Sequence, residues 1–142
     1  MKYVRPGRWR FESNEASRQQ DDPSIRMNDR VRDQYESYPY PHRDPAEESG
    51  PLRVGSPSHI DEINHYIYAG HRDFREPFRA LVAGGGSGDA LIMLAQQLAD
   101  ARCPSEVLYL DLSHASRAIA EARAEARGLT NIRFLSASLL DA

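Results

Sequence analysis

The sequence predicts an α/β fold, in which strands and helices alternate along the chain and form the first β-α-β-α-β half of a doubly wound parallel sheet. Three observations predict it. An apolar run at 80–83 leads at once into the glycine turn Gly84–Gly88 and then into a helical pattern. A second β-prone run, 106–110, ends in Asp111, and a third follows at 132–136. Strands separated by helix-length segments are typical of parallel sheets.

The chain divides into three regions by composition. Residues 1–30 are polar, charged and rich in turn formers, so we expect a disordered tail. Residues 31–78 form an N-terminal extension with short helices, and 41–57 within it is expected to be weakly ordered. Residues 79–142 contain the alternating strands and helices.

The extension contains two helical signals. The segment 31–41, which includes Gln34-Tyr35-Glu36 and ends in Pro-Tyr-Pro, predicts a short helix that stops at Tyr38 and an extended stretch after it. Its tyrosines, Tyr35, Tyr38 and Tyr40, either close over a ligand or pack against the side of the domain.

The second helical signal covers 58–70 and has Ser58 as the expected N-cap. Its apolar face consists of Ile60, Ile63, Tyr66 and Ile67. We expect this helix to cover the edge of the sheet near the first strand.

The glycine turn has the spacing G-x-G-x-G, with glycine at 84, 86 and 88. Glycine permits a positive φ and lets a ligand approach the backbone closely. The amides of Ser87, Gly88 and Asp89 are expected to point from a helix start toward a polar or anionic group. No Lys-Ser/Thr pair follows, which excludes a P-loop, and the third small residue of the dinucleotide fingerprint falls on Asp89. A flexible linker is disfavoured because strand and helix signals flank the turn tightly.

Asp111 ends the second strand about 20 residues beyond the glycine turn, where an acidic residue can accept hydrogen bonds from both hydroxyls of a ribose. The alternative is that Asp111 only caps the next helix. Ser113 is itself a good N-cap, which favours the ribose interpretation.

The two helices of this region follow from periodicity. The first, 89–101, carries an apolar face of Leu91, Leu94, Ala95 and Leu98 and is stopped by Pro104. The second, 113–127, has a thin apolar face of Ile119, Ala122 and Ala126. Gly128 is its expected C′ residue.

The region from about 79 to 141 resembles the first half of a class I S-adenosylmethionine-dependent methyltransferase domain, a Rossmann-like fold. The resemblance rests on the glycine turn, on Asp111 and on the third strand with the loop after it. The segment 31–41 is also similar to one that precedes some bacterial methyltransferase domains. Val82 and Ser138 depart from the family's pattern, which often has acidic residues at both positions.

The resemblance implies S-adenosyl-L-methionine as the cofactor and assigns its ligands. Gly84, Gly85, Gly86, Ser87 and Gly88 would hold the methionine part. Asp111, with its neighbour Leu112, would bind the ribose. Ser138 and Leu139 would flank the adenine, with a backbone contact from Leu139 in place of the missing acidic side chain.

The resemblance also implies methylation of an acceptor that the sequence does not identify, and it assigns no catalytic residue. The family's sheet has more strands than this sequence supplies, so we expect the chain to be an amino-terminal fragment of a larger protein and inactive alone. Two alternatives remain open: a fragment of an NAD(P)-binding Rossmann oxidoreductase, and a non-catalytic binding module that retains the fold.

Composition narrows the partners and the compartment. The net charge of −3, without a dense basic patch, gives no nucleic-acid signal and favours a small-molecule acceptor. One cysteine, Cys103, excludes an internal disulfide, so a reducing, cytoplasmic location is expected. No apolar run approaches membrane-spanning length. The five histidines have no ligand spacing, so no metal site is expected.

Overall fold

The structure is a computed structural model that describes residues 30, 33–55 and 57–137. The expected tail, apart from residue 30, and the predicted adenine-flanking residues Ser138 and Leu139 lie outside the described residues.

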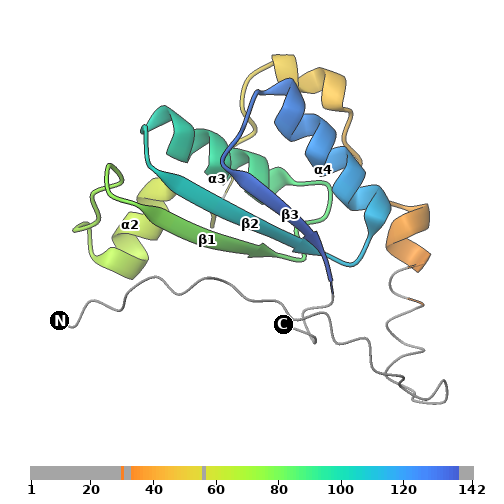
Figure 1. Ribbon diagram of the computed structural model, residues 1–142, viewed down its shortest axis with the longest axis horizontal. Coiled ribbons are helices and arrows are strands. Elements are labelled where there is room, and N and C mark those ends of the chain that lie inside the picture. The colour runs from red at the N-terminus through yellow and green to blue at the C-terminus, as the bar shows by residue number, and fades with distance from the viewer. Residues whose placement is uncertain (1–29, 31–32, 56, 138–142) are drawn as a thin grey trace.

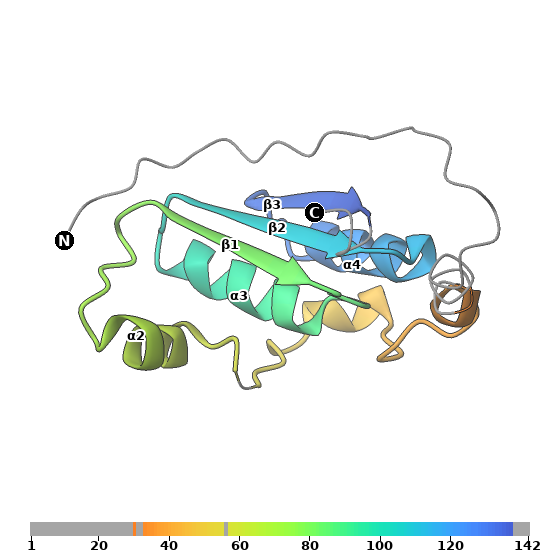
Figure 2. The ribbon, with the colours of Figure 1, turned by 90° about the horizontal axis from the view of Figure 1, so that it is seen from below.

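A three-stranded parallel sheet in the order β1-β2-β3 forms the centre of the fold. The strands are β1 (Phe78–Ala83), β2 (Ser105–Asp111) and β3 (Ile132–Ser136). The connecting helices α3 (Asp89–Asp100) and α4 (His114–Ala126) lie on the same face of the sheet (Figure 1, Figure 2). Consecutive crossovers of one hand place their helices in this way. The α/β prediction is confirmed, as one half of a Rossmann-like sheet.

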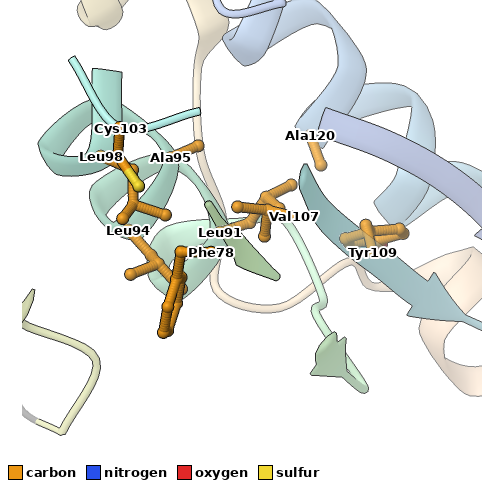
Figure 3. Packing of buried hydrophobic residues seen from close by; sticks show 9 residues of the cluster. All are labelled: Phe78, Leu91, Leu94, Ala95, Leu98, Cys103, Val107, Tyr109 and Ala120. Atoms are coloured by element: carbon orange, nitrogen blue, oxygen red, sulfur yellow. The ribbon is translucent and has the colours of Figure 1, made fainter. Parts of the chain in front are cut away.

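The core lies between the sheet and α3, as the helical periodicity predicts. The four residues of the expected apolar face of α3 are buried and point toward β1 and β2 (Figure 3). Val107 and Tyr109 of β2 meet them from the sheet, and Phe78 of β1 closes one end. Because side chains alternate along a strand, these β2 residues share the helix-covered face.

The predicted apolar face of α4 is wrong. Ile119 and Ala122 are only half-buried and Ala126 is exposed, whereas the buried residues of the helix are Ser116, Ala120, Arg123 and Ala124. Two contacts decide the orientation. The glycine turn approaches α4 so closely that a Cβ at Gly88 would lie 3.0 Å from the Cβ of Ala120. Arg123 can turn inward because the buried carboxylate of Glu48 and the partly exposed carboxylate of Asp89 neutralise its charge.

The extension is more ordered than its composition indicates. Residues 33–37 are helical and the chain leaves the helix at Tyr38, as predicted. Within 41–57, where weak order is expected, the chain forms the 3-10 helix η1 (Pro45–Ser49), which packs against α4. The buried carboxylate of Glu48 anchors η1, and the polar composition hides this anchor because the partners of Glu48 lie far away in the sequence.

The next helix of the extension, α2 (Ile60–Tyr68), begins one residue later than Ser58 predicts. His59 is its N-cap, and the imidazole Nδ1 accepts a hydrogen bond from the amide of Asp61 at 3.2 Å. Ile60 and Ile63 pack against the core, but Tyr66 and Ile67 are exposed. The helix contacts α3, so only half of its expected apolar face is covered among the described residues.

Candidate functional site

The glycine turn joins β1 to α3, and the protein itself binds all five of its amides. The amides of Gly84 and Gly85 donate to the Leu110 carbonyl, and that of Gly88 donates to the Gly85 carbonyl. The Gly86 amide donates to a carboxylate oxygen of Asp111, and the Ser87 amide donates to the Tyr40 carbonyl. The expectation that the Ser87 and Gly88 amides face a ligand is therefore wrong. The acceptor of the Ser87 amide comes from the extension, and that of the Gly88 amide comes from the turn itself.

Three glycines of the turn are required by protein contacts. A Cβ at Gly85 would lie 2.4 Å from the ring of Tyr109, and one at Gly86 would lie 2.5 Å from the Tyr40 carbonyl oxygen. Gly88 has the close approach to α4 described above. These glycines are needed to let the turn pack, whatever it binds.

Gly84 differs from the other glycines of the turn. Its φ is +64°, and no heavy atom lies within 4 Å of the position of a Cβ. It is also exposed and follows directly after the carboxyl end of β1. In a parallel sheet, ligands bind at this end of the strands. The open side of Gly84 is thus where a ligand can approach the backbone of the turn.

Asp111 lies beside the turn at the end of β2. One carboxylate oxygen accepts a hydrogen bond from the Gly86 amide at 2.8 Å, and the other accepts one from the Ser113 amide at 2.9 Å. Ser113 is the N-cap of α4, as predicted, and its Oγ accepts from the Ser116 amide. Asp111 therefore supports the helix start and the glycine turn together. Each carboxylate oxygen keeps a further lone pair, so hydroxyls of a ligand can still bind there.

Sequence reasoning missed Tyr109, a residue of β2 whose side chain packs against the glycine turn. Its ring is fully buried, and its hydroxyl donates to the Gly86 carbonyl at 2.8 Å. Burial, together with the nearby charge of Asp111, raises the pKa of this phenol well above its usual value, so it remains a hydrogen-bond donor. A tyrosine inside an otherwise apolar strand was the available signal, because a buried hydroxyl needs a partner.

Sequence reasoning also missed the role of Glu36. Its carboxylate accepts hydrogen bonds from the amides of His114 and Ala115, the latter at 3.0 Å. These are the first amides of α4, where a helix favours negative charge. The extension thus caps the helix that follows Asp111.

The extension also contacts the glycine turn, through its backbone rather than through its aromatic rings. The Ser87 amide lies 3.3 Å from the Tyr40 carbonyl oxygen, and the Ser87 hydroxyl donates to the Pro41 carbonyl at 2.5 Å. The rings of Tyr38 and Tyr40 are 79% and 73% exposed, so they do not pack against the domain. Packing against the domain is therefore excluded for Tyr38 and Tyr40, and contact with a ligand stays a prediction.

A cluster of five charged side chains, the ionic cluster, lies beside the turn and contacts it through Arg123, which donates to the Ser87 carbonyl. Its members are Arg43, Glu48, Asp89, Arg123 and Arg127. Hydrogen bonds from Arg43 and Arg123 hold the pKa of Asp89 below its usual value, although partial burial opposes this. Burial acts to raise the pKa of Glu48, but the bonds from Arg127 and Arg123 outweigh it and lower that pKa. Both carboxylates are thus ionised at neutral pH.

The described residues provide neither a metal site nor a membrane-spanning helix. Across residues 30, 33–55 and 57–137, no group of three or more His, Cys, Asp or Glu side chains is placed to hold a metal ion. None of the helices in the described part of the chain has the length and apolar character needed to cross a bilayer.

No protein-family model matches the chain, and no curated protein matches it in sequence. Several solved structures are similar to part of it, among them a cyclase and two methyltransferases. A [4+2]-cyclase, SpnF, is 20% identical with a TM-score of 0.41, over 63% of this chain and 31% of the cyclase. A SAM-dependent methyltransferase from Aquifex aeolicus is 18% identical with a TM-score of 0.40, over 68% of this chain and 48% of that one. A coclaurine N-methyltransferase bound to N-methylheliamine and SAH is 15% identical with a TM-score of 0.40, over 80% of this chain and 36% of that one. The similarity therefore spans less than half of each of these longer proteins.

Proposed function

We propose that this chain carries the cofactor-binding part of an S-adenosyl-L-methionine-dependent methyltransferase. The observation that supports it most is the contact between the Gly86 amide and the Asp111 carboxylate, 2.8 Å apart. Residues 25 positions apart in the sequence thereby meet at the carboxyl ends of β1 and β2. A glycine turn beside an acidic strand end suits a ligand that carries both a ribose and an amino-acid part.

The residues present fit this cofactor. The open side of Gly84 leaves room for a ligand against the backbone, and the free lone pairs of Asp111 suit the two ribose hydroxyls. Leu112, half-buried beside Asp111, is proposed to line the ribose pocket. Ser138 and Leu139 are proposed to flank the adenine.

When bound, the cofactor supplies a methyl group already activated by the positive charge of its sulfonium. The role of this chain is then to bind the cofactor and orient it for an in-line displacement. We propose a small-molecule acceptor and a cytoplasmic setting, and we assign the methyl transfer itself to a longer protein that also contributes the acceptor site. No residue of this chain is assigned as a general base.

Isothermal titration calorimetry of the chain with S-adenosylhomocysteine and, separately, with NAD+ tests the proposal. We expect saturable binding of S-adenosylhomocysteine, no binding of NAD+, and loss of S-adenosylhomocysteine binding in Asp111→Ala. Saturable binding of NAD+ with none of S-adenosylhomocysteine would replace the proposal with the dinucleotide-binding alternative. Binding of neither compound by a folded chain would overturn the assignment of a cofactor site.

A further inference from the structure

Arg123 joins the glycine turn to the rest of the molecule from the inside. Its side chain is 1% exposed, and it projects from the last turn of α4. The guanidinium Nη1 donates to the Ser87 carbonyl at 2.7 Å and to the Asp89 carboxylate at 2.9 Å. Its Nε donates to the Glu48 carboxylate at 2.5 Å. One side chain thus connects the turn, the first residue of α3 and the extension.

These contacts fix the peptide groups on both sides of Ser87. Arg123 binds its carbonyl, the Tyr40 carbonyl accepts from its amide, and the Pro41 carbonyl accepts from its hydroxyl. The next residue back is Gly86, whose amide meets Asp111. The placement of the glycine turn relative to Asp111 therefore depends on how firmly Ser87 is held.

A stabilising role alone does not account for a charge at this position. Replacing a buried ion pair by apolar residues of similar size is often neutral or stabilising, so burial of the Arg123 guanidinium brings no clear gain in stability. What an apolar side chain cannot do is donate to the Ser87 carbonyl. The guanidinium does so while its charge is neutralised by Glu48 and Asp89.

The ionic cluster makes the role of Arg123 testable without unfolding the chain. Without Arg123, Asp89 keeps its ion pair with Arg43, and Glu48 keeps its ion pair with Arg127. Neither carboxylate is left without a cation. The group that loses its partner is the carbonyl of the fully buried Ser87.

We propose that Arg123 is a positioning residue of the cofactor site, which fixes the Ser87 peptide and so sets the affinity of the glycine turn for the methionine part of S-adenosylmethionine. This inference rests on the proposed function. Arg123 touches no cofactor itself, because its side chain is enclosed by protein. Its effect is therefore confined to the part of the ligand that the turn holds, and the ribose contact at Asp111 does not depend on it directly.

The test compares Arg123→Met with Arg127→Met. Both variants remove one arginine that binds Glu48, but only Arg123 also reaches the turn. We expect Arg123→Met to weaken S-adenosylhomocysteine binding by about tenfold, because the loosened turn must then be ordered when the ligand binds, and to leave adenosine binding unchanged. Arg127→Met should bind both ligands as the wild type does. Amide hydrogen exchange at 84–88 should speed up in Arg123→Met only.

Equal affinities and equal exchange at 84–88 in the two variants would overturn the inference. An equal loss for adenosine and S-adenosylhomocysteine in Arg123→Met would also overturn it, because the effect would then not be specific to the turn. If Arg123→Met does not fold, Arg123→Lys, which keeps the charge with one donor group, replaces it and should show a smaller effect of the same kind. If the wild type binds neither ligand, the proposed function fails, and the exchange comparison alone decides whether Arg123 holds the turn.

Discussion

Gly84 and Gly128 have almost the same positive φ in two different settings. Their φ values are +64° and +65°, and at neither residue does any heavy atom lie within 4 Å of the position of a Cβ. Gly84 opens the glycine turn at the end of β1, whereas Gly128 follows the C-terminus of α4. The strain of an added methyl group is therefore the same at both positions, and only the surroundings differ.

Alanine variants of Gly84 and Gly128 distinguish an effect on ligand binding from the effect of backbone strain. Gly84→Ala and Gly128→Ala should each destabilise the chain by about 1–2 kcal/mol, the cost of a left-handed backbone for a residue with a Cβ. Only Gly84→Ala should also weaken S-adenosylhomocysteine binding in calorimetry, because its methyl group projects into the space proposed for the ligand. Equal affinities in the two variants would argue that the open side of Gly84 is not the binding surface.

Gly85→Ala should destabilise the fold whether or not the chain binds a cofactor. Its methyl group would overlap the buried ring of Tyr109, and such overpacking costs about 1–3 kcal/mol. Urea denaturation monitored by circular dichroism measures the change in the free energy of unfolding. The matched control is Gly55→Ala, where no heavy atom lies within 4 Å of the added methyl group and where we expect almost no change. A loss in the control as large as that in Gly85→Ala would contradict the packing explanation.

Glu36→Ala should destabilise the chain by about 1 kcal/mol, as expected for the loss of a helix cap. The comparison is Glu125→Ala, which removes an exposed carboxylate from the other end of α4. Hydrogen exchange should rise at His114 and Ala115 in the first variant only. If both variants exchange alike at these amides, Glu36 does not cap α4 in solution.

The ionic cluster predicts that the fold loses stability in acid. The pKa values of Asp89 and Glu48 are lower in the folded chain than in the unfolded chain, so both carboxylates contribute stability above their unfolded values of about 4. That contribution is lost as the pH falls below this range. Thermal melting between pH 7 and pH 3 should show the fall, and Asp89→Asn should reduce its slope. An unchanged slope in this variant would mean that Asp89 is not part of the acid response.

Much of the fold follows from the sequence because the signals involved are local. The third strand, Ile132–Ser136, and the N-cap Ser113 occur as predicted. The meeting of Gly86 with Asp111 also follows, since parallel strands bring their carboxyl ends to one edge. In these cases neighbouring residues, or the geometry common to all parallel sheets, decide the structure.

The contacts that the sequence does not reveal are those chosen by distant partners. An arginine in a helix is expected at the surface, and Arg123 can be buried because its charge is neutralised by Glu48, 75 positions earlier, and by Asp89, 34 positions earlier. Glu36 likewise has no local feature that marks it as a cap for α4. The face of α4 that is buried depends on the segment 41–57, which contains Glu48. Because the composition of that segment indicates little order, the sequence led to the wrong apolar face for α4.

The cap on α4 also has a consequence for the order of folding. Glu36 and His114 are 78 positions apart, so their contact closes one of the longest loops in the described part of the chain. Forming such a contact costs more chain entropy than forming a β-α-β unit from neighbouring segments. The extension is therefore expected to dock after the sheet and its helices have assembled. In a nascent or partly unfolded chain Ser113 already caps α4 locally, and the amides of His114 and Ala115 are the last of this helix start to gain an acceptor.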